Sequence, residues 1–260
     1  MKYYGSIEEI VKKCTQSYQM LIKFGTRENL IKLQAGSLYM KNLKYYNELE
    51  AKDGDGKPDE YDGKWAVQDV KVILSDPRTM QPIALGTAKK TVMSFGYEMN
   101  PVFCLFSYDY RNCGEPTINQ STKNIQIATK FNDEQIAKLK TGLGEYALII
   151  LDTDAFLQRV DKTLKDQRIE YLCKRVIYNY GNSVDRVDSI LADNKNIAFN
   201  KDKDTFSYQQ ELRILVLNQR VDDHICLDIG DIKSITKLIS TDELLQLRIE
   251  LNQQFEIVEE

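Results

Sequence analysis

The stretch "MLIKFGTRENLIKLQAGSLYM" (residues 20–40) joins two apolar segments through one polar segment with helical spacing. The first apolar run is typical of a short strand that ends at Gly25, and Thr26 is a favourable N-cap for the segment that follows. Leu30, Ile31 and Leu33 then recur on one helical face, and Gly36 is typical of a helix stop. Because "SLYM" has the pattern of a second short strand, residues 20–40 predict a strand, a helix and a strand.

Outward from this unit, strand patterns are concentrated in the middle of the chain. Further strands are predicted over residues 67–76, 78–86, 89–97, 101–110, 145–152, 169–180, 206–217, 223–230 and 234–240. Helices are predicted over residues 6–20, 132–144, 154–167, 183–194 and 242–254, from caps and apolar spacing. The closely spaced strands between residues 67 and 110 favour an antiparallel meander.

This arrangement predicts an α+β fold with a mixed, mainly antiparallel sheet and flanking helices, because the strands are not regularly interleaved with crossover helices. The chain has 260 residues, which one large domain can accommodate. We therefore expect a single domain over residues 1–260. Within it, residues 52–64 form a polar loop rich in glycine, and residues 241–260 form a terminal helix and tail.

Composition excludes several classes of protein. Apolar residues make up 42% and charged residues 28%, as in ordinary folded proteins. With 35 basic and 39 acidic residues the net charge is −4, so strong nonspecific binding to nucleic acid is not expected. The first residues lack the apolar core of a signal peptide, and no window has the roughly 18 apolar residues of a membrane helix. A cytoplasmic protein without a membrane partner is therefore expected.

Metal and nucleophile signals are weak. The five cysteines include no CxxC pair, and the single histidine, His224, lies in a predicted surface turn. The acidic loop that starts at Asp53 resembles the beginning of a calcium loop, but Pro58 and Lys64 occupy the positions that need glycine and glutamate. A solvated acidic loop is favoured over a weak divalent-ion site, and no metal is predicted. No phosphate-binding glycine motif of the Rossmann or P-loop type occurs.

The stretch "FSYQQELRILVL" (residues 206–217) has an unusual polar middle for a strand. Period-two alternation places Gln209, Glu211 and Arg213 on one face, and the same face becomes apolar at Leu215 and Leu217. A solvent-facing strand would explain the polar residues, with Glu211 and Arg213 neutralising each other. Because the face does not stay polar, the floor of a cleft is the other interpretation.

Aromatic residues gather after the second predicted strand, at Tyr39, Tyr45, Tyr46, Tyr61 and Trp65. Tyrosine rings at the mouth of a site can stack on a planar heterocycle while their hydroxyls bind a sugar or a phosphate. Alternatively, these amphipathic rings form the rim of the core.

Two stretches carry a family resemblance: "KFGTRENLIKLQAGSLYMKNLKYYNELE" (residues 23–50) and "YQQELRI" (residues 208–214). An N-terminal strand, helix and strand followed by a strand bearing Gln-x-Glu resembles the ADP-ribosyltransferase superfamily. The chain is also similar to a widespread uncharacterised bacterial and phage family with a C-terminal Y-x-x-E-x-R strand. The resemblance implies an ADP-ribosyltransferase-like fold, NAD as co-substrate and a macromolecular acceptor, either protein or nucleic acid.

The resemblance also assigns residues. Glu211 and Gln209 match the catalytic Gln-x-Glu, and Lys23 stands where the superfamily has an NAD-holding Arg or His. The other cofactor-binding candidates are Thr26, Tyr39, Tyr45, Tyr46 and Arg213. Lysine can contact a phosphate as a point charge but lacks the two-pronged geometry of arginine, so the first motif departs from the family pattern.

The leading interpretation is therefore an NAD-dependent ADP-ribosyltransferase, with a bacterial or phage toxin or defence effector as the implied role and an inhibitor protein as a further potential partner. A noncatalytic nucleotide or nucleic-acid recognition module on the same scaffold is the alternative. A structural interaction protein, in which the Gln-Glu-Arg face packs against loops, is a third.

Overall fold

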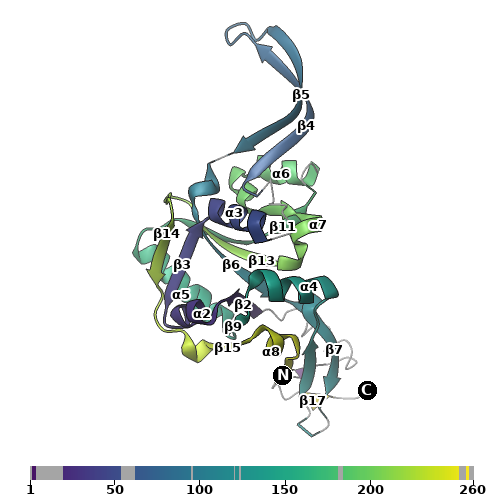
Figure 1. Ribbon diagram of the computed structural model, residues 1–260, viewed down its shortest axis with the longest axis vertical. Coiled ribbons are helices and arrows are strands. Elements are labelled where there is room, and N and C mark those ends of the chain that lie inside the picture. Colours follow the sequence, from purple (N-terminus) through teal and green to yellow (C-terminus); the bar gives the residue numbers. More distant parts are fainter. Residues whose placement is uncertain are drawn as a thin grey trace.

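The computed structural model describes residues 2–3, 20–53, 62–94, 96–119, 121–122, 124–180, 184–251 and 256–257 (Figure 1). The helix predicted over residues 6–20 lies outside these ranges except for Met20, which belongs to a strand, and most of the predicted polar loop also lies outside them. The fold is α+β, with a mainly antiparallel sheet and flanking helices, which confirms the predicted class. None of the described helices is long and apolar enough to cross a membrane.

Among the described residues, the main sheet has eight strands, and every pairing within it is antiparallel. Six of them follow the order β10-β13-β6-β2-β9-β15, while β3 and β14 form a pair that joins the sheet through β6. Their bounds are β2 Met20–Gly25, β3 Ser37–Asn42, β6 Pro101–Tyr108, β9 Tyr146–Ile150, β10 Tyr171–Arg175, β13 Glu211–Val216, β14 His224–Asp228 and β15 Thr236–Ser240.

Strand β6 connects the two parts of this sheet. One of its edges pairs with β13. Along the other edge, β2 pairs with the C-terminal end of β6, where Ile22 is opposite Phe106, and β3 pairs with its N-terminal end, where Lys41 is opposite Val102. Residues 103–105 lie between these two pairings, so the sheet divides there into two branches.

Seven α-helices are described, and they flank the sheet (Figure 1): α2 Arg27–Gln34, α3 Leu43–Asp53, α4 Asp133–Lys138, α5 Thr153–Asp166, α6 Val184–Ala192, α7 Lys203–Phe206 and α8 Thr241–Leu245. Short 3₁₀ turns add η1 Tyr97–Met99, η2 Tyr110–Asn112, η4 Asn194–Phe199, η5 Ser207–Gln209 and η6 Lys233–Ile235, and η3 Leu139–Leu143 is a π-helical turn.

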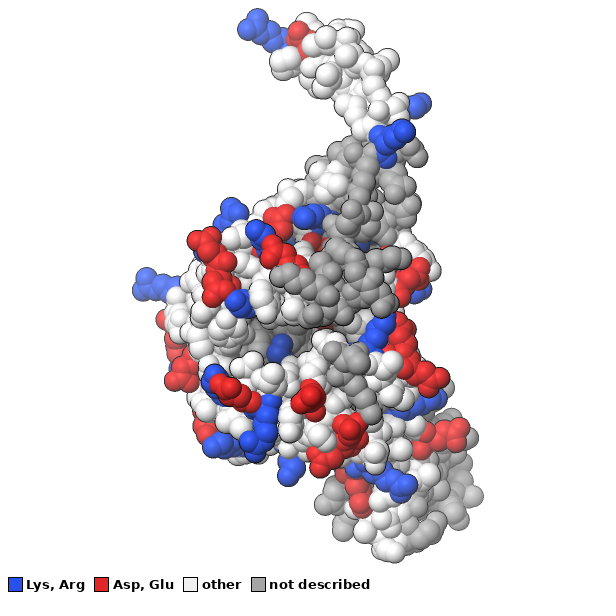
Figure 2. All heavy atoms as spheres, in the orientation of Figure 1, with Lys and Arg blue, Asp and Glu red and all other residues white. Residues whose placement is uncertain are grey.

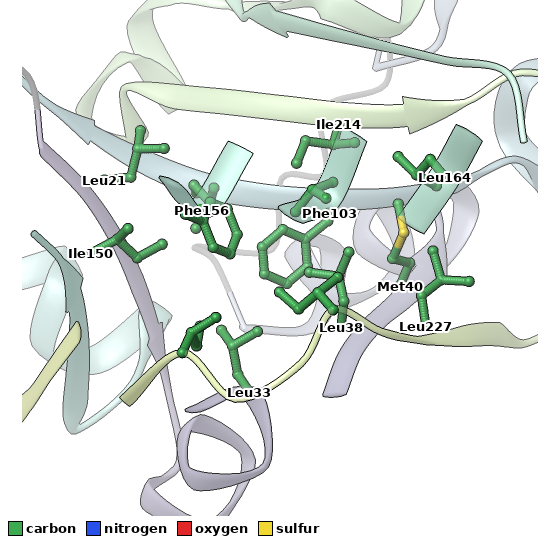
Figure 3. Packing of buried hydrophobic residues seen from close by; sticks show 14 of the residues in the cluster. Leu21, Leu33, Leu38, Met40, Phe103, Ile150, Phe156, Leu164, Ile214 and Leu227 are labelled. Carbon is green, nitrogen blue, oxygen red and sulfur yellow. The ribbon is translucent and has the colours of Figure 1, made fainter. Parts of the chain in front are cut away.

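The largest core cluster lies between one face of the sheet and the helices α2 and α5. In α5, Phe156, Val160 and Leu164 recur at four-residue spacing and are all buried, because they share one face of the helix. They pack with Phe103 of β6, Met40 of β3 and other apolar side chains (Figure 3). A second cluster on the opposite face includes Ile22, Phe106 and Leu244, and a third lies around Leu43 and Phe199.

Nine of the described strands lie outside the main sheet. Strands β4 Lys64–Ser75 and β5 Pro82–Ser94 form a long hairpin that projects from the body (Figures 1 and 2). The other bounds are β1 Lys2–Tyr3, β7 Cys113–Ile118, β8 Ile125–Thr129, β11 Ile177–Asn179, β12 Asn200–Asp202, β16 Arg248–Leu251 and β17 Glu256–Ile257. Strands β7, β8 and β16 form one sheet, and the pairs β11–β12 and β1–β17 are parallel.

Several predicted elements were wrong. The predicted meander is one hairpin followed by β6, rather than several paired strands of the sheet. Residues 43–53, for which no helix was predicted, form α3, and the side-chain oxygen of Asn42 accepts a bond of 2.9 Å from the amide of Tyr45 and caps the helix. The predicted terminal helix is only α8, because the chain turns into β16 at Arg248.

Candidate functional site

The polar stretch before β13 is not a strand, which corrects the sequence prediction for residues 206–210. The side chain of Asp202 accepts a bond of 3.0 Å from the amide of Thr205 and caps α7. A 3₁₀ turn follows, and Gln210 has a φ of +41°, so the extended backbone begins only at Glu211. Period-two alternation therefore cannot explain how Gln209 and Glu211 come together.

Glu211 is buried together with three other charged side chains, and we refer to Asp62, Lys201, Glu211 and Arg213 as the buried charge cluster. Their side chains are between 0% and 9% exposed. Arg213 forms a two-point pair with Asp62, at 2.8 and 2.7 Å, and its Nε donates to Glu211 Oε2 at 2.7 Å. Two cations and two anions balance each other, so their burial leaves no net charge uncompensated.

Lys201, in strand β12, connects the two predicted catalytic residues. Its ammonium donates to Glu211 Oε1 at 3.0 Å and to Gln209 Oε1 at 2.7 Å. Gln209 and Glu211 are therefore neighbours, as predicted, but a lysine between them provides the connection. Because Lys201 holds one carboxylate oxygen and Arg213 the other, the orientation of the Glu211 carboxylate is fixed.

The buried charge cluster keeps Glu211 ionised. Burial opposes ionisation and is the largest single influence on this carboxyl, but Arg213 and Lys201 together outweigh it and lower the pKa of Glu211 to about 2. In return, Asp62 and Glu211 raise the pKa of Arg213 above its ordinary value, against the effect of burial. At neutral pH Glu211 is therefore a carboxylate that accepts hydrogen bonds from Lys201 and Arg213.

Lys23 lies where the main sheet divides. Its ammonium donates to the backbone carbonyl of Cys104 at 2.7 Å, in the part of β6 that lies between its pairings with β2 and β3. It is also 4.6 Å from the centre of the Phe103 ring. Burial lowers the pKa of Lys23, partly offset by Cys104 and Glu211, so Lys23 is within electrostatic range of the predicted catalytic carboxylate.

The space-filling view, drawn in the orientation of Figure 1, shows a hollow near the middle of the molecule with a basic side chain on its floor (Figure 2). It lies over the region where Figure 1 places β3, β6 and β2. Three of the predicted tyrosines belong to this part of the chain: Tyr39 is in β3, and Tyr45 and Tyr46 are in α3, which follows β3. Tyr39 and Tyr45 are 43% and 39% exposed, while Tyr46 is half-buried in the third core cluster.

The environments of these tyrosines differ. Tyr39 stacks on His224 with ring centres 4.4 Å apart, and the Lys41 ammonium lies 4.6 Å from the centre of the Tyr45 ring. Burial raises the pKa of Tyr46, and Cys104, Tyr45 and Glu211 raise it further. Tyr46 therefore also lies within electrostatic range of Glu211.

The structure thus joins Gln209 to Glu211 through Lys201 and places Arg213 in direct contact with Glu211. It also brings Lys23 and Tyr46 within electrostatic range of Glu211. It does not place Thr26 among them, because the hydroxyl of Thr26 caps α2 at an exposed position. The assignment of Arg213 to cofactor binding needs correction. Its side chain is 1% exposed and donates to Asp62, Glu211 and the carbonyl of Ala198. Arg213 therefore holds the Glu211 carboxylate from the protein interior.

Sequence reasoning missed Asp62 and Lys201. Asp62 lies within residues 52–64, which were predicted as a polar loop, and Lys201 belongs to a short strand that carried no recognisable signal. Tyr61 and the side chain of Trp65 lie outside what is described. Within the described residues, no group of three or more His, Cys, Asp and Glu side chains could hold a metal ion.

No protein-family model, curated protein or solved structure matches this chain.

Proposed function

We propose that the protein is an ADP-ribosyltransferase-like enzyme that uses NAD to modify a protein or nucleic-acid acceptor, in the role of a toxin or defence effector. The observation that carries this proposal is the Glu211 carboxylate, ionised and fixed by Lys201 and Arg213. The resemblance of residues 23–50 and 208–214 to that superfamily adds to it.

The chemistry requires such a carboxylate. When the bond between the ribose C1′ and the nicotinamide nitrogen breaks, nicotinamide leaves with the electron pair and positive charge develops on the ribose. The acceptor nucleophile then bonds to C1′ and loses a proton to solvent or to a nearby base. Glu211 would stabilise the developing charge and bind a ribose hydroxyl, since each carboxylate oxygen has a second lone pair beyond its bond to Lys201 or Arg213.

Other residues would then bind and orient the substrates. The exposed rings of Tyr39 and Tyr45 offer stacking surfaces for nicotinamide or adenine. Lys23 would contribute positive charge toward the NAD phosphates. Gln209, fixed by Lys201, would orient the acceptor by hydrogen bonding.

The direct test is nicotinamide release from NAD by the purified protein, with and without protein, RNA and DNA acceptors. Glu211→Gln should lower turnover about a hundredfold or more, because it removes charge stabilisation specific to the transition state. Asp62→Asn is the matched control, since it removes one negative charge from the same buried charge cluster but leaves the Glu211 carboxylate in place. Equal losses in the two variants would contradict a chemical role for Glu211.

Because both variants alter a buried charge cluster, a substitution on the surface provides a second arm. Tyr45 is 39% exposed, so Tyr45→Ala should leave the fold intact and raise the KM for NAD. Absence of nicotinamide release by the wild-type protein with all acceptors would reject the enzymatic proposal.

Three contacts favour the alternative of a noncatalytic nucleotide or nucleic-acid recognition module. The Lys23 ammonium already donates to the Cys104 carbonyl, and both Glu211 oxygens already accept bonds from cations. Saturable binding of NAD or of an oligonucleotide without nicotinamide release, measured by titration calorimetry, would support this alternative.

A further inference from the structure

A pocket with a cavity volume of about 260 Å³ opens beside the N-terminal end of β13. Its lining includes Arg111, Arg175, Asp109, Tyr178 and Gln210, together with Glu211, the catalytic candidate of the proposed function. It does not include Lys23 or the exposed tyrosines of the proposed NAD site. The volume lies just below the range of about 300–1,000 Å³ that is usual for drug-sized ligands, so a small polar group fits it better than a whole dinucleotide.

Two arginines are fixed at this pocket by one carboxylate. Asp109 is 4% exposed and accepts bonds from Arg111, whose Nε and NH2 donate at 2.9 and 2.7 Å, and from Arg175, whose NH1 donates at 2.9 Å. The side chains of Arg111 and Arg175 are nonetheless 49% and 45% exposed. Asp109 therefore orients both guanidinium groups from within and leaves about half of each accessible.

Arg111, Arg175 and Asp109 together carry a net positive charge, because two guanidinium groups share one carboxylate. The second carboxylate of the lining, Glu211, is held by Lys201 and Arg213. Guanidinium groups fixed in this way are well suited to an anion, since little side-chain freedom is lost when the anion binds. Tyr178 adds a neutral donor. The Tyr178 hydroxyl oxygen accepts a hydrogen bond of 2.8 Å from the backbone amide of Glu211. Burial raises the pKa of Tyr178, so the hydroxyl keeps its hydrogen and can donate it.

We propose that this pocket binds a phosphoryl group through Arg111 and Arg175. Two guanidinium groups that come from different elements, η2 and β10, can each bind a separate oxygen of a tetrahedral phosphate, whereas a planar carboxylate is matched by one guanidinium alone. The remaining volume accommodates the sugar or short chain to which the phosphate is attached. Because Glu211 also lines this pocket, the bound phosphoryl group would lie beside the carboxylate of the proposed function, but its binding does not require NAD turnover.

The test uses inorganic phosphate and AMP as probes on the full chain, with titration calorimetry as the measurement. Both probes should bind saturably, and Arg175→Gln and Arg111→Gln should each weaken the binding about tenfold, as expected for the loss of a charge-assisted hydrogen bond. Arg220→Gln is the matched control, because it removes the same charge at an exposed position outside this pocket lining.

Two comparisons make the outcome decisive. Adenosine, which lacks the phosphate, should bind at least tenfold more weakly than AMP, and equal affinities would overturn phosphoryl recognition. An unchanged phosphate affinity in Arg175→Gln, or an equal loss in Arg220→Gln, would also reject the proposal. Because Asp109 keeps one arginine partner in each variant, both should fold, and an unchanged Tm verifies it.

Discussion

Arg213 and Asp62 form a two-point ion pair in the protein interior, with NH1 to Oδ1 at 2.8 Å and NH2 to Oδ2 at 2.7 Å. The pair joins strand β13 to a residue 151 positions earlier, immediately before the projecting hairpin. Because Arg213 also holds Glu211, this pair determines where the predicted catalytic carboxylate lies.

The first prediction concerns stability. Asp62→Ala leaves Arg213 and Lys201 with only one carboxylate between them, so we expect the free energy of unfolding to fall by about 3–5 kcal/mol, as for other broken buried pairs. Asp166→Ala removes the partner of Lys162 in an exposed pair and should change stability little. Urea unfolding of both variants measures the difference, and similar losses would mean that the buried charge cluster adds little to stability.

The second prediction concerns acid. The pKa of Glu211 is about 2 in the folded protein, below its ordinary value of 4.5. Its ionised form therefore adds stability that is fully present above about pH 4.5 and is lost as the pH falls toward about 2. The wild-type protein should lose stability more steeply over this range than Glu211→Gln, which has no proton to take up at this site.

Urea midpoints measured at pH 6, 5, 4 and 3 provide this comparison. Parallel curves for the wild-type protein and Glu211→Gln would mean that residue 211 has the same pKa in the folded and unfolded chains.

The third prediction concerns Lys23 in the proposed NAD site. Lys23→Ala should raise the KM for NAD more than it lowers kcat, because a charge near the phosphates acts in both the ground state and the transition state. Lys23→Arg should retain more of the NAD affinity than Lys23→Ala, since arginine keeps the positive charge. Steady-state kinetics distinguishes the two parameters, and a variant with normal KM and kcat would remove Lys23 from the site.

The fourth prediction concerns a close backbone contact. Gly144 has a φ of +131°, and a Cβ atom there would lie 2.7 Å from the backbone of Gly25 at the end of β2. Gly144→Ala should therefore destabilise the protein markedly. A Cβ at Gly86 of the hairpin would meet nothing within 4 Å, so Gly86→Ala is the control and should leave Tm nearly unchanged. Equal Tm values for the two variants would contradict this account.

The part of the fold that local pattern decides was predictable. Thr26 caps α2 as expected, and in β3 the buried Leu38 and Met40 flank the exposed Tyr39, which is the alternation of a strand with one face on the core. In such segments the residues that set the secondary structure are also the ones that pack.

The environment of Glu211 was less predictable because distant residues determine it. Residues 206–210 alternate like a strand, yet the cap at Asp202 and the positive φ of Gln210 interrupt the extended backbone before Glu211. Lys201 and Asp62 have no periodic pattern that marks them as buried, and only the tertiary fold brings them to Glu211. The proximity of Gln209 and Glu211 was thus predicted for the wrong reason.

The long separation between Asp62 and Arg213 has a consequence during synthesis. A ribosome produces Asp62 well before Lys201 and Arg213, so for 151 residues of elongation the nascent chain contains the aspartate without its buried partner. Glu211 and Arg213 emerge almost together, and only then can the carboxylate acquire its fixed orientation and low pKa. An interrupted chain that stops before residue 213 would therefore carry the NAD-facing tyrosines of the proposal but no assembled charge centre.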